Sequence, residues 1–250
     1  MTHSKCEQEL AVPCYFFDVN RTLRPASFFD LAQEVAVQGA TMIGAPDSVL
    51  MKRGLVWILI RMHVHYEGLP TVGDSVRLQT WHSGVTGPLY TRDYLMLDQG
   101  GKTLVRATSS WALMEVSTRS IAKAERIFDI MPPEPQWPER VMDANAPKII
   151  WPRGAAAEAS SLHTVMYSDV DYNGHANNAR YPVWAFDSLP PELTTKNRLS
   201  DFYINYNREL HLGETTELVR TTRESGSFII EGRSNGQQNF ICRLDFLPNR

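Results

Sequence analysis

The sequence predicts an α+β fold in which two similar units follow one another along the chain. Three observations support this prediction: apolar and polar residues alternate with a period of two in both halves, each half has one segment with helical spacing, and a Pro-rich stretch separates the halves. Proline lacks a backbone donor and restricts the residue before it, so we expect this stretch to be extended. The units are therefore expected at residues 1–124 and 161–250, joined by a linker at residues 125–160.

The first unit is expected to have a helix that starts at Ser27. Ser27 and Asp30 have the spacing of a capping box, apolar residues follow at helical intervals, and Gly44 favours the end of the helix. The second unit has a less clear helix at about residues 178–189, because Pro182 falls within or just after its first turn.

Strands are expected to follow the helix in each unit and to pair as antiparallel meanders. Residues 61–74 and 201–214 align without gaps at a constant offset of 140, and their apolar side chains alternate in the same phase, as in half-buried strands. Asn235 and Gly236 favour a tight hairpin. A curved antiparallel sheet around one helix is a hot-dog unit, so the pattern favours a double hot-dog over an unspecified α+β fold with an accidental repeat. The further strand segments are 75–82, 89–97, 103–115, 215–223, 227–233 and 237–246.

Composition and charge argue against several other classes of protein. The net charge of −3 shows no global excess of basic residues, so no nucleic-acid partner is expected. The longest aliphatic run, residues 55–60, is far shorter than the roughly 20 residues of a membrane helix. The N-terminal residues resemble neither a signal nor a transit peptide, and the three cysteines lack C-x-x-C spacing. We therefore expect a cytoplasmic chain with reduced thiols and without membrane insertion, disulfides or a zinc site.

A dense polar segment, residues 168–179, precedes the second predicted helix. Segments rich in Asp, Asn and Gly also form turns and helix caps, so a purely structural role is an alternative. Glu209 is a second polar feature, at the end of a predicted strand over residues 201–209, and the equivalent position of the first unit is Leu69. The polar groups are thus confined to one unit, which favours chemistry there and a pocket-shaping role for the other.

These polar segments resemble the acyl-ACP thioesterase family of plants and bacteria, which has the double hot-dog fold. The pattern Asp-x-Asn-x-His-x-Asn-Asn at residues 171–178 is followed by Tyr-x-Arg-Glu at residues 206–209. The resemblance implies hydrolysis of the thioester between a fatty acyl chain and acyl carrier protein, which releases free fatty acid and ends fatty-acid synthesis. Similar segments of the first unit are residues 24–27, 55–58, 70–74, 80–81 and 106–111.

The resemblance places the family's catalytic positions at four residues of the second unit. It implies Glu209 as the general base or, alternatively, as a direct nucleophile. Asn173 would donate to the oxyanion or orient water, and His175 would hold the substrate carbonyl and water. Asp171 would orient Glu209 or the loop. Many plant members have a cysteine after the glutamate, but this chain has Leu210, so a thiol nucleophile is excluded at this site.

The implied partner is acyl carrier protein with a phosphopantetheine-linked acyl chain, and neither a cofactor nor a metal is implied. Because the carrier is acidic, a basic surface beside the site would favour its docking. Two units in one chain already form a pseudo-dimer, and a further homodimer stays open. The expected substrate-binding residues are Asn177, Asn178, Arg180, Arg208 and Trp57. Other cations that could join this surface, or be only solvated charges, are Lys52, Arg53, Arg119, Lys123 and Arg126.

Other functions are weighed against this one. An acyl-CoA thioesterase of the same fold is the nearest alternative, and a non-catalytic acyl-binding module is a more distant one. A hot-dog dehydratase is disfavoured, because the chain has no loop of the His-Phe-Pro-Gly-His-Pro type. A metal shared by His63 and His65 is also disfavoured, since no third ligand is evident and the polar face of a strand explains both residues.

Overall fold

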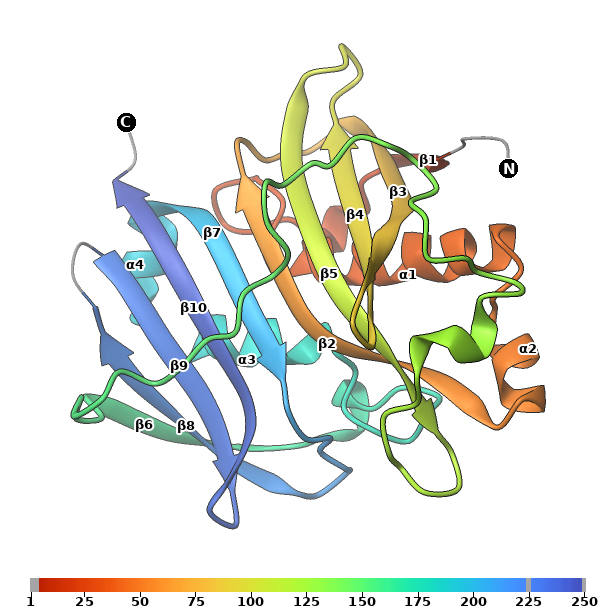
Figure 1. Cartoon of the computed structure of the whole chain (residues 1–250). Helices are drawn as coiled ribbons and strands as arrows, with labels where there is room; N and C mark the ends of the chain where they lie inside the picture. The colour runs from red at the N-terminus through yellow and green to blue at the C-terminus, as the bar shows by residue number, and fades with distance from the viewer. Residues whose placement is uncertain (1–4, 224–225, 249–250) are drawn as a thin grey trace.

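The computed structural model describes residues 5–223 and 226–248, which form one large antiparallel sheet with helices on one face (Figure 1). The strand order across the sheet is β1-β3-β4-β5-β2-β7-β10-β9-β8-β6. The strands are β1 (Cys6–Ala11), β2 (Leu55–Tyr66), β3 (Ser75–Thr86), β4 (Leu89–Leu97), β5 (Thr103–Glu115), β6 (Ala159–Thr164), β7 (Asn197–Tyr206), β8 (Thr215–Thr222), β9 (Ser227–Ser234) and β10 (Gln237–Pro248). The helices are α1 (Ser27–Met42), α2 (Asp47–Lys52), α3 (Arg180–Asp187) and α4 (Pro191–Lys196), with short 3-10 turns η1 (Cys14–Phe16), η2 (Ala124–Ile127) and η3 (Tyr167–Asp169).

The two halves of the sheet meet where β2 pairs with β7 (Figure 1). One pair of residues that differ by the 140-residue offset of the sequence repeat lies at the centre of this antiparallel ladder: His63 is opposite Tyr203, and their rings stack with centroids 3.9 Å apart. This pair therefore marks an approximate two-fold axis between the units. Beside it, Oδ1 of Asp201 lies 2.9 Å from His63 Nε2 and 3.0 Å from His65 Nδ1. One carboxylate of the neighbouring strand thus contacts both histidines.

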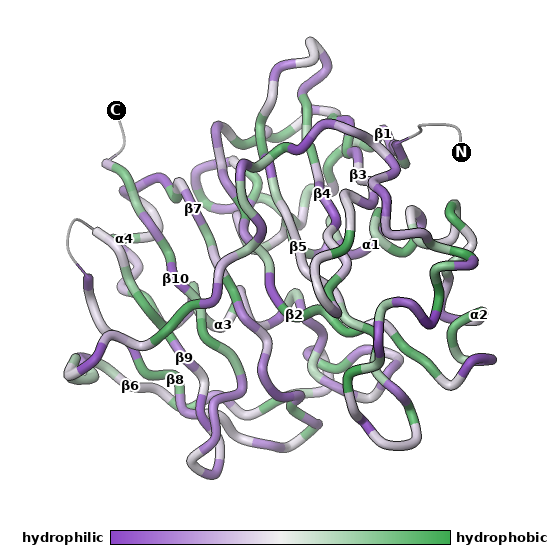
Figure 2. Tube along the Cα trace, viewed as in Figure 1, coloured by the Kyte–Doolittle hydropathy of each residue, from purple (hydrophilic) through white to green (hydrophobic). Residues whose placement is uncertain are grey.

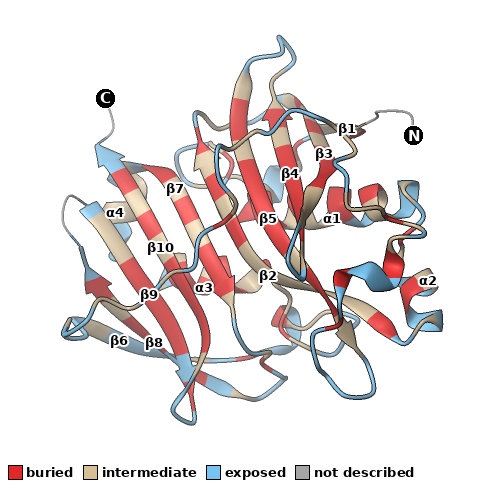
Figure 3. Cartoon of the chain, viewed as in Figure 1, coloured by how far each residue is buried: buried red, intermediate tan, exposed pale blue. Residues whose placement is uncertain are grey.

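The apolar cores of the two units are continuous beneath the sheet. Phe29 of α1 and Phe186 of α3 both contact Phe202 of β7, with ring centroids 5.3 Å and 5.9 Å away. Phe202 is fully buried, and buried aromatic side chains of this kind dominate core energetics. Hydrophobic residues recur along the strands, whereas the turns at the sheet ends are mostly hydrophilic (Figure 2). Buried residues accordingly concentrate in the strands and on the inner faces of α1 and α3 (Figure 3).

The Pro-rich linker crosses the outer face of the sheet, opposite α1 and α3 (Figure 1). In the second unit, Asn205 of β7 accepts a hydrogen bond from Ile149 N–H at 2.7 Å and donates through Nδ2 to the Pro147 carbonyl at 3.0 Å. In the first unit, the indole N–H of Trp81 donates to the Glu139 carbonyl at 3.1 Å. The linker is therefore a strap that is hydrogen-bonded to both units.

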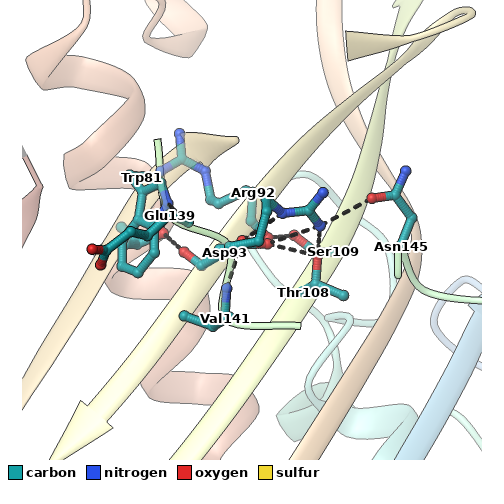
Figure 4. Close-up of polar contacts among 10 residues, drawn as sticks. Trp81, Arg92, Asp93, Thr108, Ser109, Glu139, Val141 and Asn145 are labelled. Atoms are coloured by element: carbon teal, nitrogen blue, oxygen red, sulfur yellow. Dashed lines mark hydrogen bonds and ion pairs between the residues drawn. The ribbon is translucent and has the colours of Figure 1, made fainter. Parts of the chain in front are cut away.

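Asp93 of β4 is a fully buried carboxylate beneath this strap (Figure 4). Arg140 of the strap donates to it through Nε at 2.8 Å, and Val141 donates its backbone N–H at 3.2 Å. Thr108 of β5 donates its hydroxyl at 2.8 Å. A buried charge is tolerated when an opposite charge and further hydrogen bonds satisfy it, and this set supplies both. The contacts fix the path of the strap over the first unit.

The main predicted turns are present. α1 ends before Gly44, whose φ of 83° lies in the left-handed region that favours glycine. Asn235 and Gly236 have φ values of 51° and 73°, as a two-residue type I′ hairpin requires. Pro182 lies in the first turn of α3, where a missing N–H removes no intrahelical bond. β1, β6, α2 and α4 are not among the elements predicted from the sequence.

The predicted capping box of α1 is wrong. Ala26 is the N-cap, and no side chain caps the helix. The Ser27 N–H donates instead to the Arg24 carbonyl at 2.9 Å, because the preceding residues already form a turn. Asp30 does not reach back to the cap but pairs with Arg180 at the start of α3.

The predicted strand over residues 201–209 is too long. β7 ends at Tyr206, because the N–H groups of Asn207 and Arg208 both turn to the Asn239 carbonyl, at 2.9 Å and 3.0 Å. Glu209 consequently lies beyond the strand, and its position follows from this turn and not from the alternation of strand faces.

Candidate active site

A tight loop between η3 and α3 carries three of the four expected catalytic positions. The Asp171 N–H donates to the His175 carbonyl, and the Gly174 N–H donates to the Asp171 carbonyl, both at 3.0 Å. Gly174 has a φ of 81°, so a glycine suits this point of the turn. Oδ1 of Asp171 accepts the Asn173 N–H at 2.8 Å. The Asp171 carboxylate therefore contacts the backbone of its own loop, and its role in the reaction stays a prediction.

The structure brings His175 of this loop next to Glu209. The Ala176 N–H donates to the Leu210 carbonyl at 2.7 Å, so the two segments are joined by a backbone hydrogen bond. Leu210 is fully buried and anchors its segment in the core. Between them, His175 Nε2 lies 3.3 Å from Glu209 Oε2, and both side chains are about one-third exposed, at 30% each. An imidazole and a carboxylate thus share one partly open site, and both kinds of group can serve as general acids or bases.

Two further side chains meet this pair. Arg119, from the turn that follows β5 in the first unit, lies with Nη2 2.6 Å from Glu209 Oε2. His211 lies with its ring centroid 5.1 Å from that of His175, and its Nδ1 is 3.3 Å from the Gly174 carbonyl. The sequence offered Arg119 only as one of several surface cations, because nothing local links it to a residue 90 positions later. One feature of the sequence points to His211 as a site residue: it lies two residues after Glu209.

A cavity of about 150 Å³ lies beside the loop, between the two units. The loop contributes Asp171, Tyr172 and Asn173, and the opposite wall comes from α1, β2, β4 and β5. A smaller apolar cavity shares Gln33, Trp111 and Asn178 with the first, so the two spaces adjoin. Side chains that give the first cavity its apolar wall are Ala36, Val37, Ala40, Trp57, Trp111 and Met131.

The residues expected to bind substrate lie in different settings. Trp57 and Asn178 line the cavity. Asn177 accepts the Ala179 N–H through Oδ1 at 2.8 Å, which supports the start of α3. Arg180 pairs with Asp30, and Arg208 donates to Gln237 Oε1 at 2.6 Å. Substrate binding by all five stays a prediction.

Burial and charge restrict which other groups can act at the site. Burial raises the pKa of Tyr181, and the nearby charges of Glu209, Glu214 and Asp171 raise it further. Burial likewise raises the pKa of the Cys242 thiol. Both groups are therefore protonated at neutral pH, so neither is a base or a ready nucleophile.

Among residues 5–223 and 226–248, no group of three or more His, Cys, Asp or Glu side chains is arranged to hold a metal ion. In the same part of the chain, no helix is long and apolar enough to cross a membrane.

Comparison with known sequences gives two family matches. Residues 3–129 match the acyl-ACP thioesterase N-terminal domain, and residues 154–246 match the acyl-ACP thioesterase C-terminal domain. The chain is 28% identical over 251 residues to a chloroplastic palmitoyl-acyl carrier protein thioesterase of Cuphea hookeriana, covering 95% of this chain and 58% of that protein. It is 30% identical over 214 residues to the palmitoyl-acyl carrier protein thioesterase of Arabidopsis thaliana, covering 81% and 51%. The chain thus spans little more than half the length of these relatives.

Comparison with solved structures supports the fold. A 12:0-ACP thioesterase from Umbellularia californica superposes with a TM-score of 0.88 at 23% identity, over 98% of both chains. An acyl-ACP thioesterase from Bacteroides thetaiotaomicron gives a TM-score of 0.86 at 23% identity, over 97% of this chain and 98% of that one. These similarities confirm the predicted double hot-dog fold. Together with the family matches over both units, they show that this chain belongs to the acyl-ACP thioesterase family.

Proposed function

We propose that the chain hydrolyses the thioester of fatty acyl-acyl carrier protein and releases free fatty acid. The observation that carries the proposal is the contact between Glu209 and His175, at 3.3 Å, beside a loop whose Asn173 lines a cavity that has an apolar wall. Such a cavity suits an acyl chain, because each buried methylene contributes about 0.8 kcal/mol. The polar groups and the apolar wall together fit a substrate with a reactive carbonyl at one end of a hydrocarbon chain.

In the proposed reaction, a water molecule gives a proton to Glu209 while its oxygen bonds to the thioester carbonyl carbon. The carbonyl oxygen gains negative charge and accepts a hydrogen bond from the Asn173 amide. His175 keeps the water and the carboxylate in place. The carbon–sulfur bond then breaks, and the thiolate takes the proton from Glu209. Because a thiol has a pKa of about 8.5, it leaves without a strong general acid.

Direct attack by Glu209 is the alternative mechanism, and isotope labelling distinguishes the two. In a single turnover in heavy-oxygen water, a general base places the label only in the fatty acid. A nucleophilic Glu209 forms an acyl anhydride, and hydrolysis of the anhydride leaves the label in either the fatty acid or the Glu209 carboxylate. Mass spectrometry of the peptide that contains Glu209 therefore separates these mechanisms.

Acyl carrier protein is proposed as the partner, and coenzyme A is the alternative carrier. The relatives are named for acyl carrier protein substrates, which favours the first. A homodimer and a cytoplasmic location stay predictions, and these relatives are named chloroplastic.

The test is thiol release by the purified protein from acyl-ACP and from acyl-CoA with the same acyl chain. We expect a higher kcat/KM on acyl-ACP. Glu209→Gln and His175→Ala should abolish most of the activity, whereas Glu217→Gln, a change at an exposed carboxylate on β8, should not. Full activity in the double variant Glu209→Gln/His175→Ala would contradict the site. Tight acyl binding without turnover would instead support an acyl-binding module.

A further inference from the structure

We propose that Arg119, supplied by the first unit, is a positioning residue for the Glu209 carboxylate. This inference rests on the proposed function, because it assigns a role within the same hydrolytic site. It also modifies the expected division of labour, in which the first unit only shapes the acyl pocket.

The contact geometry is the first argument. Arg119 Nη2 lies 2.6 Å from Glu209 Oε2, and His175 Nε2 lies 3.3 Å from the same oxygen. Both contacts fall on Oε2, so neither group engages Oε1. The carboxylate is therefore held from one side by two nitrogen groups, and its other oxygen is left to accept a proton from water. A guanidinium is well suited to this task, because its planar, permanently charged donors fix the orientation of a carboxylate.

The backbone that carries Arg119 is the second argument. Its φ of 53° is in the left-handed region, which is uncommon for a residue with a side chain. The turn is closed around it: the Arg119 N–H donates to the Glu115 carbonyl at 2.8 Å, and the Glu115 N–H donates to the Ser120 carbonyl at 2.9 Å. Strained backbone of this kind gathers at functional sites. Here the turn aims an arginine of the first unit at a carboxylate of the second.

The exposure of the pair decides between a structural and a functional role. The Arg119 side chain is 60% exposed and that of Glu209 30% exposed. An ion pair this open to water adds little stability, so the fold does not need it. A correctly oriented base is different, because a misplacement of about 1 Å can reduce turnover by roughly 100-fold. Arg119 is therefore expected to matter for turnover far more than for folding.

A competing role must be separated from this one. An exposed arginine beside the site could leave Glu209 and bind the phosphate of the carrier's pantetheine arm. That role would affect KM, and only for substrates that carry the phosphate. Positioning of Glu209 would affect kcat, and it would do so for every thioester.

The experiment compares Arg119→Gly and Arg119→Lys with the wild-type chain. Glycine keeps the left-handed backbone but removes the cation, and lysine keeps a cation. Arg21→Gly is the matched backbone control, because Arg21 also has a positive φ, of 63°. Arg106→Gln is the matched charge control, because Arg106 forms an exposed ion pair with Glu67 at 2.9 Å near the other end of β5. kcat and KM are measured by thiol release from acyl-ACP and from an acyl-N-acetylcysteamine thioester, which lacks phosphate and protein.

We expect Arg119→Gly to lower kcat by about 10- to 100-fold on both substrates, with KM little changed. Arg119→Lys, or guanidinium added to Arg119→Gly at a low, non-denaturing concentration, should restore part of the loss. Both controls should keep wild-type kcat. Unchanged kcat in both Arg119 variants, or a rise in KM confined to acyl-ACP, would overturn the proposal while leaving the proposed function intact. A wild-type chain that releases no thiol from any thioester would refute the proposed function, and this role with it.

Discussion

Replacement of Asp93 tests how the strap is held on the first unit. Asp93→Leu keeps the number and branching of the side-chain heavy atoms but has no acceptor, so it removes the hydrogen bonds from Thr108 and Val141 and the ion pair with Arg140. Asp93→Asn is the milder change, because the amide keeps one oxygen for Arg140 and Val141, and the Thr108 hydroxyl can rotate to accept from its NH₂ group.

The size of the effect follows from which groups are left without partners. Thr108 is fully buried, and its hydroxyl proton would lose its acceptor, which costs about 1–3 kcal/mol for a buried donor. The same cost applies to the Val141 N–H if the strap stays in place. The Arg140 side chain is 33% exposed and can turn to water, so it adds less than a fully buried cation would. We expect Asp93→Leu to lose about 3 kcal/mol and Asp93→Asn about 1 kcal/mol.

Thermal unfolding measures this difference. For a chain of this size, 1 kcal/mol corresponds to a Tm shift of about 2–4 °C, so Asp93→Leu should lower the Tm by roughly 6–12 °C. Limited proteolysis should also cut the strap near Arg140 more readily in this variant. Glu134→Gln, a change at an exposed strap residue, is the control. An unchanged Tm together with an unchanged cleavage pattern in Asp93→Leu would refute the reasoning that Asp93 anchors the strap.

Four further predictions concern the site and its surroundings. Glu209→Gln should lower kcat by about 10²–10⁴, the usual contribution of a positioned base, in the thiol-release assay. Asn173→Ala should lower kcat by about 10²–10³ if its amide donates to the oxyanion, and a change in KM alone would contradict that role. Gly39→Ala places a Cβ 2.5 Å from Arg92 Nη1, so the Arg92 side chain, which lines the cavity, must shift. We expect this shift to shorten the space for the acyl chain, and gas chromatography of the released fatty acids should then show shorter chains. Burial, helped by the charge of Arg92, lowers the pKa of His82 from 6.5 to about 4, so the unfolded chain takes up the proton first as the pH falls. The stability contributed by neutral His82 is therefore present above pH 6.5 and lost as the pH falls to about 4, and the Tm of His82→Phe should depend less on pH across this window.

The fold was predictable where local patterns decide it. The alternation along β2 and β7, the hairpin at Asn235 and the end of α1 at Gly44 depend on neighbouring residues, and the structure confirms them. The segments that repeat at the 140-residue offset lie next to each other as β2 and β7, a pairing that the sequence did not predict. The predicted capping box is absent because Asp30 forms an ion pair with Arg180, which lies 150 positions further along the chain.

The candidate site was predictable only in its second-unit part. Asp171, Asn173 and His175 lie within five residues of one another, so a motif reveals them. Glu209 followed from a resemblance, although the strand expected to carry it ends at Tyr206. The sequence offered Arg119 only as a surface cation, because its contact with Glu209 depends on how the turn after β5 is placed against the other unit.

The pairing of β2 with β7 has a consequence for any attempt to divide the chain. If either half were produced alone, the strand edge that now bonds its neighbour would be open to solvent, and unpaired edges recruit other strands. Phe202 would also lose Phe29, its aromatic neighbour from the other half. Separately expressed halves should therefore recombine with each other when mixed, or associate with copies of themselves. The covalent connection has a corresponding benefit, because it keeps the two different units at one-to-one stoichiometry. Each unit then pairs with the other unit and not with a second copy of itself, so the two sequences can diverge in role.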